Sequence, residues 1–250
     1  MKKPKISIIT ANHNSEKFIT TTIESVLAQT EQDWEMIIID DNSLDKGVKI
    51  IEEYCLRDER FKLLKNTTNL GPAKTRNKGL EAAQGRYICF LDSDDIWYES
   101  FLEKSVEYLE KNNVAFVFSS YDRKDEALEN DNGTFYVPLK VSYNDLLKTC
   151  PISCLTAMYD VDVVGKVLMP DILKRQDFGL WLQILKRVPY AYGMQEPMAI
   201  YRMRENSVSR NKFHAAKYQW IVYREVEGLN LIKSCSCLMQ WAFYGFKKYY

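Results

Sequence analysis

The first 120 residues alternate between short apolar runs and longer amphipathic stretches, and this alternation restricts the fold more than any other feature. The run 36–39, Met-Ile-Ile-Ile, is apolar at every position, so a strand formed from it must be covered on both faces. The stretch 15–29 instead places Phe18, Ile19 and Ile23 on one side, as an amphipathic helix does. Buried strands joined by such helices predict an α/β fold with a mostly parallel sheet flanked by helices. We expect strands at 5–10, 34–40, 61–65, 86–91 and 114–119, and helices at 15–29, 45–56, 72–83 and 99–111.

The pattern is weaker after residue 120. Residues 121–132 are charged and poor in apolar side chains, which predicts an exposed turn or a mobile loop. No internal repeat or low-complexity linker follows, so we expect one domain over 1–211, with halves at 1–120 and 121–211, and a C-terminal helical extension over 212–250. The other expected elements are a structured segment at 134–137, strands at 155–159 and 198–201, and helices at 143–148 and 179–186.

Composition excludes several classes of protein. The chain has 250 residues, 46% of them apolar, which is enough for a sizeable core. Lys plus Arg and Asp plus Glu both number 34, and zero net charge argues against a general nucleic-acid binder. Cys150 and Cys154 have a loose metal-like spacing, but neither a second pair nor a His pair follows, so reduced thiols are the simpler interpretation.

The segment Phe-Leu-Asp-Ser-Asp-Asp at 90–95 closes one of the apolar runs. Carboxylates crowded at the end of a buried strand repel one another unless positive charge lies beside them. A divalent Mg or Mn ion that holds a diphosphate is one solution, because hard oxygen ligands suit both metals. A solvated turn followed by a helix cap is the other.

Polar side chains follow three of the expected strands, at 10–12, 40–43 and 92–95. Because ligands of open α/β sheets bind at the carboxyl ends of the strands, these clusters predict a nucleotide-type site along one edge.

Six motifs, taken in order, resemble the inverting glycosyltransferases of family 2, which have the GT-A type of Rossmann-like fold. The chain is most similar to bacterial glycosyltransferases of teichuronic acid, capsule and O-antigen biosynthesis. The motifs are Ser-Ile-Ile-Thr-Ala-Asn-His-Asn at 7–14, Ile-Asp-Asp-Asn-Ser-Leu-Asp at 39–45, Asn-Leu-Gly-Pro-Ala-Lys-Thr-Arg-Asn at 69–77, the acidic segment 90–95, Arg-Gln-Asp at 175–177 with Trp181, and Tyr-Arg at 201–202 with Ser-Val-Ser at 207–209.

The resemblance implies a site for a nucleoside diphosphate sugar, with a UDP-sugar as the expected donor. Asp41 would accept the N–H of the uracil base, although an Asx turn leaving the strand is the alternative. Thr10 and Asn12 would line the same nucleotide pocket. Arg76 would reach the base or the diphosphate, and otherwise lies on a solvated helix face.

The resemblance also implies a divalent cation, Mn or Mg. Asp92 and Asp94 form an Asp-x-Asp unit, whose side chains point the same way if the segment is extended. Asp94 would be the direct metal ligand, and Asp92 would lie near the ribose or the metal. Arg204 stands where the family often has a histidine, and it could offer its charge to the diphosphate, with Arg202 or Arg210 nearby.

Asp177 is the catalytic base that the resemblance implies. It precedes an expected amphipathic helix, so a helix N-cap is the alternative, and a helix N-terminus would keep the carboxylate ionised in either role. The family commonly has an acidic residue just before this Asp, whereas Gln176 stands here. The predicted reaction is direct attack by an acceptor hydroxyl, with inversion at the anomeric carbon.

The C-terminal stretch 234–250 is aromatic and ends with basic residues. It is too short to span a bilayer comfortably, so it either packs on the domain or lies at a membrane interface. The N-terminus has too few apolar residues for a signal peptide. We therefore expect a cytoplasmic protein. If the stretch 234–250 lies at a membrane interface, the protein would contact the inner face of the cell membrane peripherally.

The predicted function is a metal-dependent hexosyltransferase of cell-surface glycan synthesis, with a lipid-linked or polysaccharide acceptor and no nucleic-acid partner. A non-catalytic nucleotide-sugar-binding module is an alternative, and Asp177 argues against it. A sugar nucleotidyltransferase is another, but its Gly-rich phosphate loop is missing from 10–16.

Overall fold

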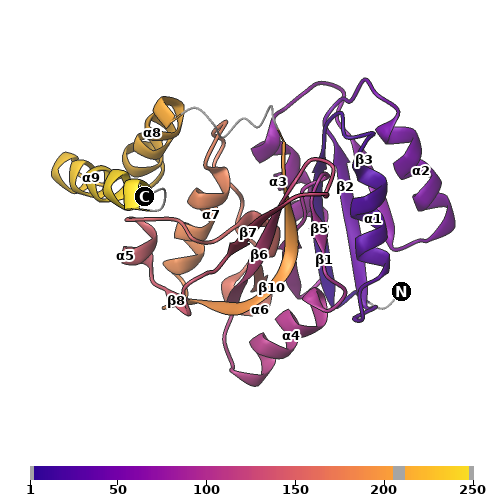
Figure 1. The fold of residues 1–250 in the computed structure, drawn as a ribbon, viewed down its shortest axis with the longest axis horizontal. Helices are drawn as coiled ribbons and strands as arrows, with labels where there is room; N and C mark the ends of the chain where they lie inside the picture. The colour runs from indigo at the N-terminus through magenta and orange to yellow at the C-terminus, as the bar shows by residue number, and fades with distance from the viewer. Residues whose placement is uncertain (1–2, 205–211, 248–250) are drawn as a thin grey trace.

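The computed structural model describes residues 3–204 and 212–247, with side chains left out at 212–214 and 245–247. Its centre is a single sheet with the strand order β3-β2-β1-β4-β9-β6-β10-β5 (Figure 1). Strands β3, β2, β1 and β4 are parallel neighbours, β9 runs antiparallel between β4 and β6, and β10 is parallel to β6. The strands are β1 Ile6–Asn12, β2 Trp34–Asp40, β3 Phe61–Lys65, β4 Tyr87–Phe90, β5 Ile96–Trp97, β6 Phe116–Asp125, β7 Asp131–Phe135, β8 Lys140–Val141, β9 Met158–Asp160 and β10 Ala191–Met203.

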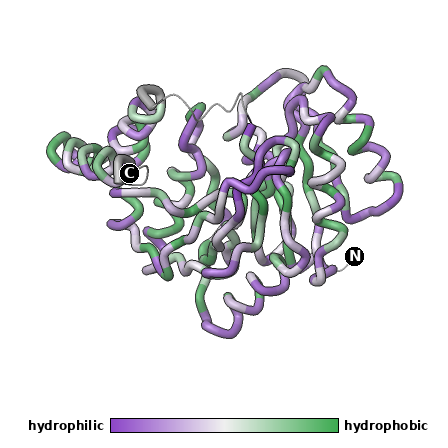
Figure 2. Tube along the Cα trace, in the orientation of Figure 1, coloured by the Kyte–Doolittle hydropathy of each residue, from purple (hydrophilic) through white to green (hydrophobic). Residues whose placement is uncertain are grey.

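Helices cover both faces of this sheet, as the alternating pattern predicts. On β2, Met36 and Ile38 pack with α1, α2 and α4, whereas Ile37 and Ile39 pack with α3 and α7. This explains why the run 36–39 has no polar position. Figure 2 shows the apolar residues gathered on the central strands. The helices are α1 Ile19–Leu27, α2 Gly47–Arg57, α3 Pro72–Ala82, α4 Phe101–Lys111, α5 Tyr143–Leu146, α6 Val161–Val164, α7 Gln176–Leu185, α8 Lys212–Ile221 and α9 Leu231–Lys247.

The prediction of an exposed turn or mobile loop at 121–132 is wrong for most of its length. Strand β6 continues to Asp125 and forms an antiparallel hairpin with β7, and its outer half also pairs with β10. The charged side chains there do not prevent a strand, because the ladder is made by the backbone. Only the connection 126–130 lies outside the two strands.

Other boundaries also differ from the prediction. The segment 155–159 begins in a 3-10 turn, Cys154–Thr156, before β9. Strand β10 has thirteen residues and continues through two register shifts on either side of Pro197, where the sequence pattern indicates a break. Helix α7 begins at Gln176, three residues earlier than expected.

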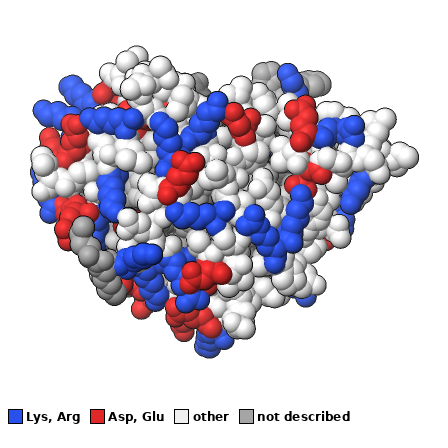
Figure 3. Space-filling model, turned by 180° about the vertical axis from the view of Figure 1, so that it is seen from behind, with Lys and Arg blue, Asp and Glu red and all other residues white. Residues whose placement is uncertain are grey.

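The C-terminal helices pack against the rest of the domain through α5 and α7. The side chain of Glu227 is fully buried and lies 2.7 Å from Nζ of Lys186, at the end of α7. The Tyr223 ring lies 6.2 Å from the ring of Phe178. Within the described ranges, no helix combines the length and the apolar character needed to cross a bilayer. On the face drawn in Figure 3, basic and acidic side chains are interspersed, in keeping with the charge balance.

Candidate active site

Strands β1 and β2 end side by side, and their last residues, Asn12 and Asp40, are joined by a hydrogen bond. Nδ2 of Asn12 donates to Oδ1 of Asp40 over 2.7 Å, and Ser15 donates its hydroxyl to Oδ1 of Asn12. The backbone N–H of Ser43 donates to the other carboxylate oxygen of Asp40 over 3.1 Å. Asn12 and Asp40 are both buried. The side chain of Asn12 therefore shapes the loop after β2, while the loop itself borders the sheet edge.

Asp41 joins this edge to the start of α3. Its carboxylate accepts the backbone N–H groups of Leu70 at 2.8 Å and Gly71 at 2.9 Å, and Nδ2 of Asn66 at 2.8 Å. Burial raises the pKa of Asp41, but these hydrogen bonds outweigh it and hold the pKa below its usual value. These donors lie 25 to 30 positions away in the sequence, so the Asx-turn interpretation of Asp41 is wrong, and an ionised carboxylate is present where the uracil contact is predicted.

Arg76 lies on α3 and is buried, with one NH2 nitrogen donating to Oδ1 of Asp92. Within the described residues, Nε and the other terminal nitrogen of Arg76 are buried without a hydrogen-bond partner. Burial lowers the pKa of this guanidinium, but Asp92, with a smaller contribution from Asp177, raises it above its ordinary value. Arg76 is therefore not on a solvated face, and two of its guanidinium nitrogens are enclosed without a partner from the described residues.

Asp94 and Asp95 continue the acidic segment. Burial, followed by repulsion from Asp92, raises the pKa of Asp94, and an ion pair of 3.1 Å with Arg204 opposes the shift. Asp95 is more deeply buried, and burial with repulsion from Asp94 raises its pKa well above the ordinary value. The segment thus holds more negative charge than its surroundings neutralise.

Strand β10 fastens this segment from the other side. Arg202 donates its backbone N–H to Oδ1 of Asp95 over 2.8 Å and its Nε to the backbone oxygen of Asp94 over 2.7 Å. The guanidinium groups of Arg202 and Arg204 both lie 5.0 Å from the ring of Phe18. Arg210 and the Ser-Val-Ser motif at 207–209 lie outside the described residues.

Asp177 lies in the first turn of α7, where helix dipoles favour a negative charge. The N-cap is Arg175, which adopts a left-handed conformation with φ 65°, so the N-cap interpretation of Asp177 is wrong. Asp177 is half-buried, and no hydrogen bond or ion pair engages it within the described ranges. Its electrostatic interaction with Arg76 brings it to the same site as Asp92.

Thr10 is fully buried in β1, and its hydroxyl has no partner within the described residues. Sequence reasoning did not find the roles of Asn66, Phe18 and the backbone of Arg202. These contacts join residues between 25 and 184 positions apart, and no local pattern marks them.

The donor set of the acidic segment fits a hard divalent cation. Asp92 and Asp94 offer carboxylate oxygens, and the raised pKa of Asp94 reflects negative charge that a cation would relieve. In the part of the chain that the structure describes, no group of three or more His, Cys, Asp or Glu is assembled as a closed metal cage. Such a site suits Mg or Mn, which take one or two carboxylates and fill the other positions with phosphate oxygens and water.

Comparisons of the sequence give a consistent result. The profile of Glycosyl transferase family 2 matches residues 7–163. The teichuronic acid biosynthesis glycosyltransferase TuaG of Bacillus subtilis is 43% identical over 98% of both chains. The β-1,3-glucosyltransferase WfgD of Escherichia coli, which uses UDP-Glc and α-D-GlcNAc-diphosphoundecaprenol, is 40% identical over 87% of this chain and 84% of its own.

Solved structures share the fold. TarS of Staphylococcus aureus in complex with UDP-GlcNAc superposes with a TM-score of 0.73 over 95% of this chain and 71% of its own, at 19% identity. The mannosyltransferase PcManGT of Pyrobaculum calidifontis, in complex with GDP-Man and Mn²⁺, gives a TM-score of 0.62 over 88% of this chain and 61% of its own, at 15% identity. With its sequence profile, near full-length relatives and GT-A fold, the chain belongs to glycosyltransferase family 2.

Proposed function

We propose that this glycosyltransferase moves a hexose from a UDP-sugar to a hydroxyl of a saccharide carried on a lipid diphosphate, in cell-surface glycan synthesis. The UDP-sugar and the lipid-linked acceptor are carried over from relatives such as WfgD. Asp177 is the observation that carries the proposal. The neighbouring carboxylates of Asp41, Asp92 and Asp94 are engaged by donors or cations, whereas that of Asp177 is unengaged within the described part of the chain.

The residues of the sheet edge bind the donor in this proposal. Asp41 is ionised and accepts the uracil N–H with its remaining lone pairs. The free Nε and terminal nitrogen of Arg76 donate to the diphosphate, and the charge of Arg204 lies close to the acidic segment. Thr10 and Asn12 complete the nucleotide pocket, Asn12 by shaping the loop after β2.

Asp177 is the general base. It lies in the first turn of α7, where helix dipoles favour a negative charge, and it interacts electrostatically with Arg76. The acceptor hydroxyl gives its proton to the Asp177 carboxylate and attacks the anomeric carbon from the face opposite the diphosphate. The bond to the diphosphate breaks as the new bond forms, so the configuration inverts and no covalent enzyme intermediate arises.

Asp92 and Asp94 would hold the divalent cation, which supplies positive charge against the departing diphosphate when it is bound. The acidic segment is held for this task by Arg202, which binds both the backbone of Asp94 and the carboxylate of Asp95.

The test uses the full chain with Mn or Mg, a panel of UDP-hexoses and UDP-N-acetylhexosamines, and a GlcNAc-diphosphate acceptor on a short, water-soluble lipid. UDP release and product linkage are measured. Asp177→Asn should lower kcat by about 100-fold or more while the Kd for UDP is unchanged, because a general base contributes on this scale.

Asp162→Asn is the matched control, since Asp162 is an exposed aspartate that pairs with Arg86, just before β4 at the opposite edge of the sheet. It should keep full activity. Normal turnover by Asp177→Asn would contradict the assigned base. Binding of UDP-sugars by the wild type without transfer to any acceptor would instead support a non-catalytic module.

A further inference from the structure

Helix α9 has two apolar stripes on opposite sides. The inner stripe packs on the domain: Ser234 and Cys237 are buried, and Leu238 contacts the core. The outer stripe contains Ile232, Met239 and Phe243, which are 84%, 68% and 65% exposed. Their spacing of seven and four residues puts them on one face. A helix that only packed on the domain would have a polar outer face, so the outer stripe calls for a second partner.

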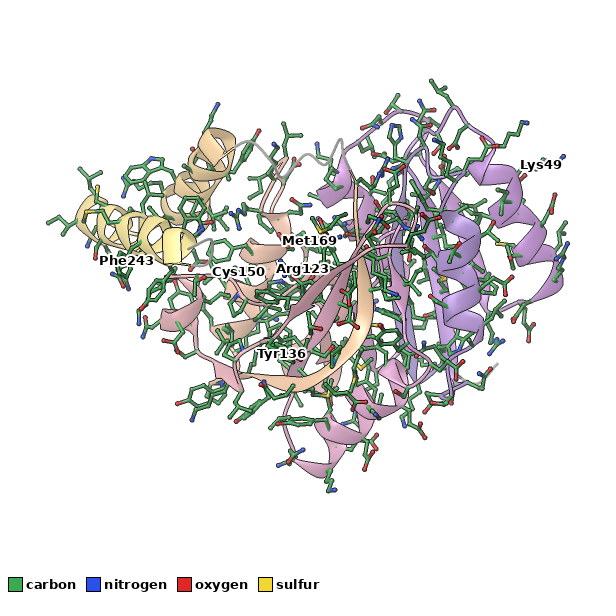
Figure 4. All side chains as sticks on the ribbon, viewed as in Figure 1. Lys49, Arg123, Tyr136, Cys150, Met169 and Phe243 are labelled. Carbon is green, nitrogen blue, oxygen red and sulfur yellow. The ribbon has the colours of Figure 1, made fainter. Side chains whose placement is uncertain are left out.

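The outer stripe lies at one end of the molecule. Helices α8 and α9 form the left end of the long axis in Figure 1, and α2 forms the right end. Figure 4 places Phe243 at this outer margin. Leu231 and Tyr244, which flank the stripe, are also exposed. Exposed apolar side chains therefore recur from Leu231 to Tyr244 on a helix of seventeen residues, which is about 26 Å long at 1.5 Å per residue.

Charge identifies the partner. The segment 228–250 contains three lysines and no Asp or Glu, although the whole chain has equal numbers of acidic and basic residues. An apolar stripe on a segment whose only charged residues are lysines matches an anionic lipid surface, which attracts the charges and buries the apolar face. A second copy of the chain would bring the same lysines together without acidic partners from this segment.

We infer that the outer stripe of α9 docks in the interface of an anionic membrane, with the helix lying along the surface. The inference rests on the proposed function only in that a lipid-linked acceptor would be met there. The C-terminal helices also contact the helix that carries the base. Trp241 of α9 lies 5.5 Å from the guanidinium of Arg175, the N-cap of α7. The start of α7, which carries Asp177, therefore lies beside the helix that docks.

The test measures binding of the full chain to vesicles of phosphatidylglycerol and phosphatidylcholine, with no substrate present. The variant Ile232→Ser/Met239→Ser/Phe243→Ser should bind about 1,000-fold more weakly, because each of the three buried apolar side chains contributes roughly tenfold. The control Leu56→Ser/Leu139→Ser/Val163→Ser removes exposed apolar residues elsewhere and should bind like the wild type. Lys233→Glu should weaken binding to the anionic vesicles and leave binding to pure phosphatidylcholine unchanged.

Several results would overturn this inference. The first is a wild type that does not bind vesicles, and the second is a triple α9 variant that binds them normally. The third is a dimer, seen by sedimentation, that dissociates in the α9 variant while vesicle binding is unaffected. The last result would assign the stripe to a second copy. Transfer to the water-soluble acceptor should be equal in the wild type and the α9 variant, with equal Tm values as evidence of folding. A wild type that binds vesicles but transfers no sugar would contradict the proposed function and leave the docking surface standing.

Discussion

Arg76→Met should separate ligand binding from stability. The Arg76 side chain is 9% exposed, and two of its three guanidinium nitrogens are buried without a partner within the described residues. Each unsatisfied buried donor costs about 1–3 kcal/mol of folding free energy. Methionine fills a similar volume without these donors. The Asp92 carboxylate that loses its partner is 35% exposed, so water can solvate it. We therefore expect the free energy of unfolding to stay within about 1 kcal/mol of the wild type or to rise.

The affinity for UDP should change in the opposite direction. If the free nitrogens donate to the diphosphate, their removal costs a charged hydrogen bond of about 1.5–3 kcal/mol. This corresponds to a Kd about 10- to 150-fold weaker, since 1.4 kcal/mol is a factor of ten. Urea unfolding without ligand measures the first quantity, and calorimetric titration with UDP measures the second.

Arg86→Met is the control for this experiment. Nε and one terminal nitrogen of Arg86 both donate to Asp160, over 3.1 and 2.7 Å, just before the start of β4. Its replacement should lower stability and leave the Kd for UDP unchanged, because the Asp160 carboxylate is itself buried. Parallel losses of stability and UDP affinity in Arg76→Met would show that Arg76 is only structural. An unchanged Kd would refute the assignment of its free donors to the ligand.

Three further changes test the site and the fold. Asp94→Ala should abolish the Mn-dependent part of UDP binding, measured by titration with and without Mn. Burial raises the pKa of Glu35, but donors including Lys62 and Ser7 outweigh this effect and lower the pKa overall. The stability that the ionised carboxylate contributes is therefore complete above about pH 4.3 and is lost as the pH falls through the folded-state pKa. Glu35→Gln should destabilise the protein at pH 7 and much less at pH 3, as measured by urea titrations. Gly85→Ala should lower the free energy of unfolding by about 1–3 kcal/mol, because the new Cβ would lie 2.5 Å from the backbone nitrogen of Ser7.

The parallel half of the sheet could be predicted because each strand is a short apolar run that ends in polar residues. The bounds 34–40 and 61–65 coincide with β2 and β3. The hairpin of β6 and β7 was missed because its residues are charged, and only pairing with distant strands makes them extended. Strand β10 was recognised only at 198–201, because Gly193 and Pro197 interrupt the apolar pattern.

The site was predictable in outline and not in its contacts. The topological rule gathers the ends of β1, β2 and β4 at one edge, and with them Asn12, Asp41 and Asp92. The rule does not predict that the loop before α3 donates hydrogen bonds to Asp41, or that Arg202 donates to the acidic segment. These bonds depend on how the chain returns to the sheet edge after residue 120, which local periodicity does not encode.

The two aspartate–arginine pairs of the acidic segment differ in how firmly they are made, and this ranks the metal ligands. The Arg76 side chain is 9% exposed, whereas that of Arg204 is 40% exposed. A partly exposed ion pair contributes only about 0–1 kcal/mol, so a divalent cation can take Asp94 from Arg204 at little cost. Withdrawing Asp92 from Arg76 would instead leave the buried guanidinium of Arg76 without a counter-charge, although the Asp92 carboxylate itself is 35% exposed. We therefore expect Asp94, rather than Asp92, to be the principal ligand. Arg204 would then be free to face the diphosphate.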